Sequence, residues 1–103
     1  MSDVGDELAR LNKETAKILW SELQKFYAQG LVICVAPDMD LIKVAAAFSQ
    51  DDKRSVETWL EAAMIFHVKD EDAIRWLEQD PVFWAVVVAP WVLVQKIGEN
   101  AVE

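Results

Sequence analysis

The chain has 103 residues, of which 53% are hydrophobic, and a formal net charge of −8. This length fits one domain, and the hydrophobic fraction excludes a disordered chain. The negative charge repels phosphate backbones and anionic lipids, so we expect neither nucleic acid nor a membrane as a partner. Cys34 is the single cysteine, so no disulfide can form within the chain. The first residues contain no signal-peptide or lipidation motif, and we expect a cytoplasmic location.

Apolar residues in the first quarter of the chain recur at the spacing of one helical face. The residues on this face are Ala16, Leu19, Trp20, Leu23 and Phe26. Gly30 follows them and is the residue type that commonly ends a helix. The pattern predicts one helix over about residues 5–28.

The middle of the chain alternates between short apolar segments and helical patterns. Residues 31–36 are β-branched and apolar on both faces, as in an interior strand, and residues 65–68 predict a second short strand. Asp40 and Asp70 stand where the N-caps of the following helices are expected. The predicted helices cover about residues 41–49, 51–64 and 71–79.

Residues 82–94 form a run without any charged residue, with Pro90 inside it. The run is too short to cross a bilayer as a helix, which needs about 20 residues, so protein must cover it. Proline cannot donate a ladder hydrogen bond and marks an edge, a bulge or a bend. We predict one long bent strand over residues 82–96, or two strands in series; a helix over residues 91–97 is the competing interpretation. Residues 98–103 form a polar tail.

The predicted order of elements is α-β-α-α-β-α-β(β) in a single domain. Helices between strands indicate crossover connections and a small mixed or partly parallel sheet, packed by amphipathic helices. The predicted fold class is therefore α+β, with a small α/β fold as the alternative.

Three segments of the chain are familiar when taken together. They are residues 14–23 (ETAKILWSEL), the strand at residues 31–36 followed by Asp40-Leu-Ile, and residues 84–95 (WAVVVAPWVLVQ). With these segments the chain resembles a family of bacterial proteins of about this length that is catalogued only as a domain of unknown function. The resemblance implies a bacterial, cytosolic, single-domain protein, and it supplies no activity, cofactor or catalytic residue.

Asp38 and Asp40 form an Asp-X-Asp pair directly after a predicted strand, where α/β folds bind ligands. Two carboxylates there are suited to hold Mg²⁺ or to attack a phosphoryl group. Turn formation after Pro37 and capping of the next helix explain the same residues, and no Gly-rich phosphate loop accompanies them. We favour the capping interpretation and expect no metal or cofactor. An acidic pocket at this pair is the alternative.

Cys34 and His67 are the other candidates for chemistry. Cys34 lies in the middle of a strand, where burial raises the pKa of a thiol and opposes a nucleophilic role. His67 faces outward if Phe66 and Val68 face the core. One Cys and one His do not make a zinc site, which needs three or four ligands. We therefore expect a buried small residue and a surface residue.

Trp84 and Trp91 are the candidates for an interface or a pocket. The other three tryptophans fall on the apolar faces of predicted helices and are expected in the core. Trp84 and Trp91 are seven residues apart, so on one continuous strand they would face opposite sides of the sheet. An indole ring combines an apolar body with a polar tip, which suits interfaces and ligand pockets. We predict such a role for at least one of the two.

These features favour a small, acidic, non-catalytic interaction or homo-oligomer module. Its C-terminal apolar strand is expected to be buried in the core and is the candidate subunit contact. The expected partner is a second copy or another protein, and a small-molecule ligand remains unidentified. The alternative is a ligand-binding or metal- or phosphate-dependent enzyme domain that uses Asp38 and Asp40.

Overall fold

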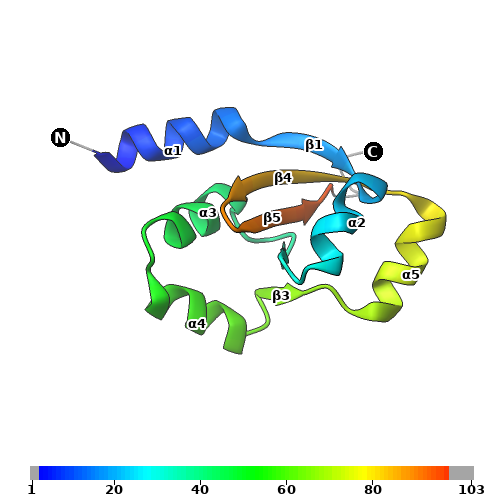
Figure 1. Cartoon of the computed structure of the whole chain (residues 1–103). Helices are drawn as coiled ribbons and strands as arrows, with labels where there is room; N and C mark the ends of the chain where they lie inside the picture. Colours follow the sequence, from blue (N-terminus) through cyan, green and yellow to red (C-terminus); the bar gives the residue numbers. More distant parts are fainter. Residues whose placement is uncertain (1–2, 98–103) are drawn as a thin grey trace.

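The computed structural model describes residues 3–97, which form five helices and five strands (Figure 1). The helices are α1 (Asp3–Glu14), α2 (Trp20–Ala28), α3 (Leu41–Ser49), α4 (Lys53–Glu61) and α5 (Asp70–Gln79). The strands are β1 (Ala16–Leu19), β2 (Val32–Val35), β3 (Ile65–His67), β4 (Val82–Val88) and β5 (Trp91–Lys96). The predicted polar tail at residues 98–103 lies outside the described residues.

The strands form one sheet in the order β1-β4-β5-β2-β3. β2 and β5 are parallel, and the other three neighbouring pairs are antiparallel. This confirms the predicted α+β class and its mixed sheet. β5 lies in the middle of the sheet between β4 and β2, so residues 92–94 are all buried.

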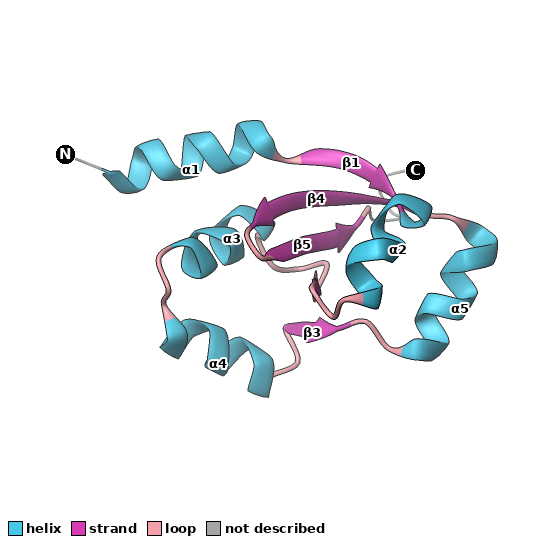
Figure 2. Cartoon of the chain, in the orientation of Figure 1, coloured by secondary structure: helices cyan, strands magenta, loops and turns pink. Residues whose placement is uncertain are grey.

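Helices cover both faces of the sheet, and each face has its own hydrophobic core (Figure 2). α1, α3 and α4 contribute to the aliphatic core, whose buried residues are Leu11, Ile33, Val35, Leu41, Val44, Ala45, Ala46, Ile65, Val86 and Leu93. α2 and α5 contribute to the aromatic core, whose buried residues are Trp20, Leu23, Val32, Cys34, Ala73, Trp76, Phe83, Ala85, Val92 and Val94. Successive residues of β2 fall alternately into the two cores, as the pleat of a strand requires.

The predicted helix over residues 5–28 is wrong, because its middle forms strand β1. α1 ends before Thr15, whose hydroxyl donates to the Leu11 carbonyl at 2.8 Å. β1 then pairs with β4, and just beyond it the Trp20 N–H donates to the Pro81 carbonyl at 3.0 Å. The strand with which β1 pairs lies far along the chain, so the local pattern contained no sign of it.

Of the two predictions for the C-terminal run, the single long bent strand is wrong, and the alternative of two strands gives their number correctly. Their connection differs from the prediction, because β4 and β5 form an antiparallel hairpin. Its turn consists of Ala89 and Pro90, which are joined by a cis peptide bond. The competing helix that would begin at Trp91 is wrong as well, since this residue opens β5. The sequence did not predict this turn, because it lacks the Asn-Gly or Gly-Gly pair that usually signals a two-residue hairpin loop.

The hairpin places Trp84 and Trp91 on the same face of the sheet. Trp91 stands opposite Val88, and Trp84 stands opposite Gln95. Residues directly opposite each other project to one face, and Trp84 and Val88 share a face because side chains alternate along β4. The expectation that the two tryptophans face opposite sides therefore fails. Both belong to the face that carries the aliphatic core.

Local signals predicted some helix termini and not others. Asp40 caps α3 as predicted and accepts from the Ile42 N–H at 3.0 Å. Asp52 caps α4, which ends earlier than predicted, before Ala63 takes a positive φ of 60°. The predicted cap at Asp70 is wrong, because this residue is already the first of α5 and the N-cap position belongs to a lysine.

Candidate functional site

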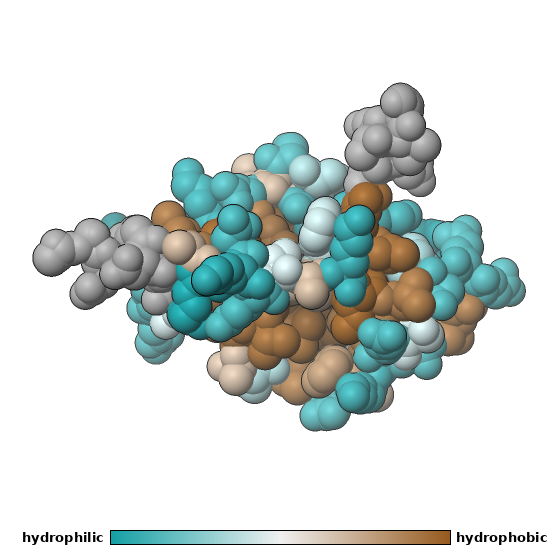
Figure 3. All heavy atoms as spheres, turned by 90° about the horizontal axis from the view of Figure 1, so that it is seen from above, coloured by the Kyte–Doolittle hydropathy of each residue, from teal (hydrophilic) through white to brown (hydrophobic). Residues whose placement is uncertain are grey.

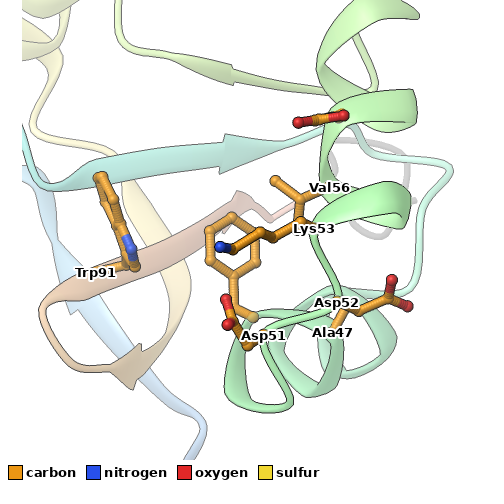
Figure 4. Close-up of a pocket in the computed structure, with 8 residues that line it drawn as sticks. Ala47, Asp51, Asp52, Lys53, Val56 and Trp91 are labelled. Atoms are coloured by element: carbon orange, nitrogen blue, oxygen red, sulfur yellow. The ribbon is translucent and has the colours of Figure 1, made fainter.

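A cavity of about 270 Å³ lies beside Trp91, at the margin of the aliphatic core (Figure 4). The start of β5, the end of α3, the α3–α4 turn and the first turn of α4 enclose it. Phe48 and Trp91 form an aromatic wall with ring centroids 6.3 Å apart and an interplanar angle of 68°. Val56 extends the apolar lining from α4. The cavity can therefore accept an apolar or aromatic group.

Charged side chains line the same cavity. Figure 4 shows the Lys53 ammonium reaching toward Trp91, with the Asp51 carboxylate at the rim and Asp52 turned away. Asp52 binds Ser55 instead: the Ser55 hydroxyl and N–H donate to its carboxylate at 2.8 and 3.2 Å. These hydrogen bonds to Ser55 lower the pKa of Asp52. Asp51, Lys53 and Glu57 therefore remain as the charged side chains that a ligand in the cavity would meet, and among the described side chains Asp51 and Lys53 form no ion pair with each other.

Trp84 lies at the other end of the same sheet face, where α1 and α3 leave the strands uncovered. It is 37% exposed, and beside it Leu19 and Val82, paired across β1 and β4, are 37% and 39% exposed. The Lys17 Nζ lies 5.2 Å from the centroid of the Trp84 ring. We call Leu19, Val82 and Trp84 the Trp84 surface. In the view from above, apolar surface reaches solvent between the polar side chains (Figure 3).

Between the Trp84 surface and α3 lies a second hollow, of about 400 Å³. Gln95 forms part of its lining, and its side-chain amide donates to the Ala36 and Met39 carbonyls at 2.8 and 2.6 Å. These bonds fix the β2–α3 loop to β5, so the hollow has a rigid wall.

Asp38 and Asp40 are both exposed at this loop. Asp40 uses one carboxylate oxygen to accept from the N–H groups of Ile42 and Lys43 at 3.0 and 3.4 Å. Among residues 8–97, whose side chains the structure describes, no three or more His, Cys, Asp or Glu side chains are arranged to hold a metal. Asp38 stands in the turn before α3, and Asp40 caps the helix.

The other two candidates lie where the sequence placed them. Cys34 is buried in β2, and burial raises the pKa of its thiol to about 12, with a smaller effect from the Asp72 charge. At that pKa the thiol is protonated at neutral pH and is not a nucleophile. His67 is exposed on β3, at one edge of the sheet.

Several residues near the two tryptophans escaped the sequence analysis. Phe48 and Lys53 meet Trp91 only because α3 and α4 fold back beside the β4–β5 turn. Leu19 was assigned to a buried helix face, although it is an exposed strand residue beside Trp84. The sequence signal for this site was the pair Trp84 and Trp91, because two indole rings outside the predicted helices are expected to pack against other side chains.

No helix in residues 3–97 is long and apolar enough to cross a membrane.

The fold and site define a small α+β domain with a mixed five-stranded sheet, two cores and two tryptophans at the margins of one core. The family model described as "Protein of unknown function (DUF2288)" matches residues 7–96, so the chain belongs to this family. Among solved structures, the chain is similar to that described as "NMR solution structure of PA1075 from Pseudomonas Aeruginosa". The two share 41% sequence identity with a TM-score of 0.78, over 97% of this chain and 90% of the other. A search of curated proteins gave no match.

Proposed function

We propose that the protein is a small, non-catalytic interaction module that binds a protein partner through the Trp84 surface. Leu19, Val82 and Trp84 form an exposed apolar cluster beside an edge strand of the sheet. Apolar clusters at a sheet edge are common contact surfaces, because they combine unpaired backbone groups with side chains that favour burial. This cluster is the observation that carries the proposal.

Because β5 is an interior strand of the sheet, the proposed contact surface does not lie on this C-terminal strand. β5 has a hydrogen-bonded strand on each side, so its backbone has no free edge. Its side chains at residues 92–94 are buried within the chain. The strand therefore stabilises the domain, and β1 and its neighbour β4 supply the contact.

The side chains that could take part in catalysis have other roles in this proposal. The carboxylates at Asp40 and Asp52 are committed to helix caps, and Cys34 is a protonated core residue. General acid–base or nucleophilic chemistry needs groups placed together with shifted pKa values in a cleft. A binding role uses the exposed apolar surface and requires no such group.

Sedimentation equilibrium over a broad concentration range tests the proposal. We expect reversible association of the wild-type protein, and loss of that association in Trp84→Glu. Ile74→Glu is the matched control, because it places the same charge at an exposed apolar residue on α5, away from the surface. Equal association of both variants would contradict the role of the Trp84 surface. A wild-type protein that stays monomeric would show that the partner is not a second copy of the chain.

The cavity at Trp91 supports a second function, the binding of a small zwitterion of amino-acid size. An ammonium group would find the Asp51 carboxylate, a carboxylate would find Lys53, and an apolar side chain would pack on Trp91 and Phe48. An NMR titration with a panel of free amino acids tests this. We expect shifts confined to the α3–α4 turn and β5 that disappear in Trp91→Ala but persist in Trp84→Ala; no shift with any amino acid contradicts it.

A further inference from the structure

Strand β1 has one free side, and the register of the sheet identifies which of its backbone groups point there. Within residues 3–97, β1 pairs only with β4, with Ile18 opposite Phe83. One position beyond β1, the Trp20 N–H donates to the Pro81 carbonyl, which continues the same register. Bonded and non-bonded pairs alternate along antiparallel strands, so Ile18 is also bonded to β4. The N–H and C=O groups of Lys17 and Leu19 therefore point away from the sheet.

We propose that a second copy of the chain pairs with this edge, antiparallel, with a two-fold axis through Ile18. This inference rests on the proposed function and names its partner. In this register Lys17 of one copy stands opposite the partner's Leu19, and Leu19 stands opposite the partner's Lys17. Both outward N–H groups and both outward C=O groups of each copy are then satisfied, which gives four hydrogen bonds across the axis. An interface of this kind is isologous, as two-fold dimers require.

The side chains of β1 fit the same register on both faces. On the aromatic face, Ile18 is half-buried and packs against the aromatic core. Pairing brings it against the partner's Ile18, so the aromatic cores of the two copies become continuous through this contact. On the other face, the Trp84 surface of each copy borders the strand, and Leu19 meets the aliphatic stem of the partner's Lys17.

Lys17 is the feature that argues most strongly against pairing, because edge lysines commonly protect a strand from other chains. Here the Lys17 ammonium lies over the Trp84 ring of its own sheet, 5.2 Å from the ring centroid. The charge is thus directed back onto the domain and not past the edge. The proposed register also separates the two lysines, since each faces a leucine. The lysine therefore favours this register over one that places the two charges opposite each other.

The distribution of charge along the chain also favours this edge of the sheet as the contact between two copies. Residues 1–28 contain five acidic and four basic residues, whereas residues 31–103 contain thirteen acidic and six basic residues. The near-neutral part of an acidic chain is the part that two copies can bring together with the least repulsion. The opposite edge of the sheet is β3, which has only three residues and lies in the acidic part.

Cysteine cross-linking tests the register directly. At the two-fold axis the Cα atoms of residue 18 are about 4.5 Å apart, within the range of a disulfide. We expect Ile18→Cys to form a covalent dimer in the majority of molecules under mild oxidation. Lys17→Cys is the matched control, because its two Cα atoms are about 8 Å apart and cannot be bridged. The native Cys34 is buried and does not compete.

A proline variant tests the same pairing without a covalent bond. The φ of Leu19 is −82°, which proline tolerates, and in the register of β1 and β4 its N–H points away from β4. Leu19→Pro removes two hydrogen bonds per dimer, so we expect the dissociation constant to rise at least about ten-fold relative to Leu19→Ala, which retains the N–H. Circular dichroism confirms that both variants are folded.

The outcomes separate this inference from the proposed function. A wild type that associates while Ile18→Cys and Lys17→Cys cross-link equally, or while Leu19→Pro and Leu19→Ala associate equally, overturns the pairing and leaves the interaction module intact. A wild type that stays monomeric at every concentration overturns the self-pairing, and only a different protein partner at the Trp84 surface would then preserve the proposed function. Selective cross-linking of Ile18→Cys supports both.

Discussion

The two faces of the sheet are closed in different ways. The centre of the aromatic face is packed with rings: the ring centroid of Trp20 lies 5.1 Å from that of Trp76 and 6.2 Å from that of Phe83, and all three side chains are almost fully buried. A hollow of about 450 Å³ lies beside these rings, between α2 and α5. The aliphatic face is well packed at Leu93 but open at both ends, with a tryptophan and a hollow at each margin. We therefore expect single substitutions to be most costly among the buried rings of the first face, whereas the two tryptophans of the second face stand at its margins.

The helices on the two faces are held by different means. α3 and α4, on the aliphatic face, begin with side-chain caps at Asp40 and Asp52. α2 and α5, on the aromatic face, follow Leu19 and Lys69, whose own side chains make no capping hydrogen bond. The start of α2 is held from another element instead, because Asp80 accepts from the Ser21 N–H at 2.9 Å. Ring packing contributes to the position of both helices, because tertiary packing supplies most of the stability of a short helix. The comparison predicts that core substitutions are most costly on the aromatic face and cap substitutions on the aliphatic face.

The largest effect is expected at Trp20. Its side chain is 1% exposed and contacts three other rings, so Trp20→Ala should lower the free energy of unfolding by about 3–5 kcal/mol. Urea denaturation followed by circular dichroism measures this. A loss below that expected for Trp91→Ala would show that the aromatic core is not the main source of stability.

A smaller effect is expected at Trp91, on the open face. The ring is half-buried beside an existing cavity, so Trp91→Ala should cost about 1–2 kcal/mol. The same denaturation experiment applies, with Trp91→Phe as the control that keeps an aromatic wall against Phe48. A loss of unfolding free energy equal to that of Trp20→Ala would mean that the two faces of the sheet are packed equally well at these tryptophans.

The cap at Asp40 should contribute about 1 kcal/mol, because its carboxylate accepts from two helix N–H groups. Asp40→Ala removes the acceptor, and Asp40→Asn retains one. We expect the first variant to unfold at lower urea concentration than the wild type, and the second to differ little from it. Equal stability of the alanine and asparagine variants would indicate that α3 is held by packing alone.

The smallest effect is expected from the titration of Asp52. Hydrogen bonds to Ser55 lower the pKa of Asp52 in the folded protein. Its ionised form therefore stabilises the fold above the pKa of the unfolded chain, and this contribution is lost as pH falls through the folded pKa. The difference in unfolding free energy between wild type and Asp52→Asn should shrink in acid. A difference that grows on acidification would contradict the assignment of Asp52 as an ionised cap.

The sequence predicted those features that depend on local pattern. The interior strand around Cys34, the helix capped by Asp40 and the burial of residues 92–94 follow from β-branched content, capping chemistry and an uncharged run. The helix predicted over residues 5–28 and the single strand predicted over residues 82–96 failed for one physical reason. β1 and the β4–β5 turn are fixed by pairing between strands, and neither Ala16–Leu19 nor Ala89-Pro90 carries a turn or strand signal strong enough to show it.

The candidate site was predicted only in part for the same reason. Trp84 and Trp91 were identified from their unusual positions, and both line hollows at the margins of the aliphatic core. Their neighbours Phe48, Lys53 and Leu19 come from three other elements. The pairing of β1 with β4 brings Leu19 beside Trp84, and the packing of α3 and α4 beside the β4–β5 turn brings Phe48 and Lys53 to Trp91.

Amide exchange at β1 tests the central claim, the self-complementary free edge, most directly. Two-dimensional NMR can follow the Leu19 amide, which points away from the sheet, and the Ile18 amide, which is bonded to β4. We expect exchange at Leu19 to be fast in dilute solution and to slow progressively on concentration, while Ile18 stays slow throughout. Exchange at Leu19 that is independent of protein concentration would contradict the claim.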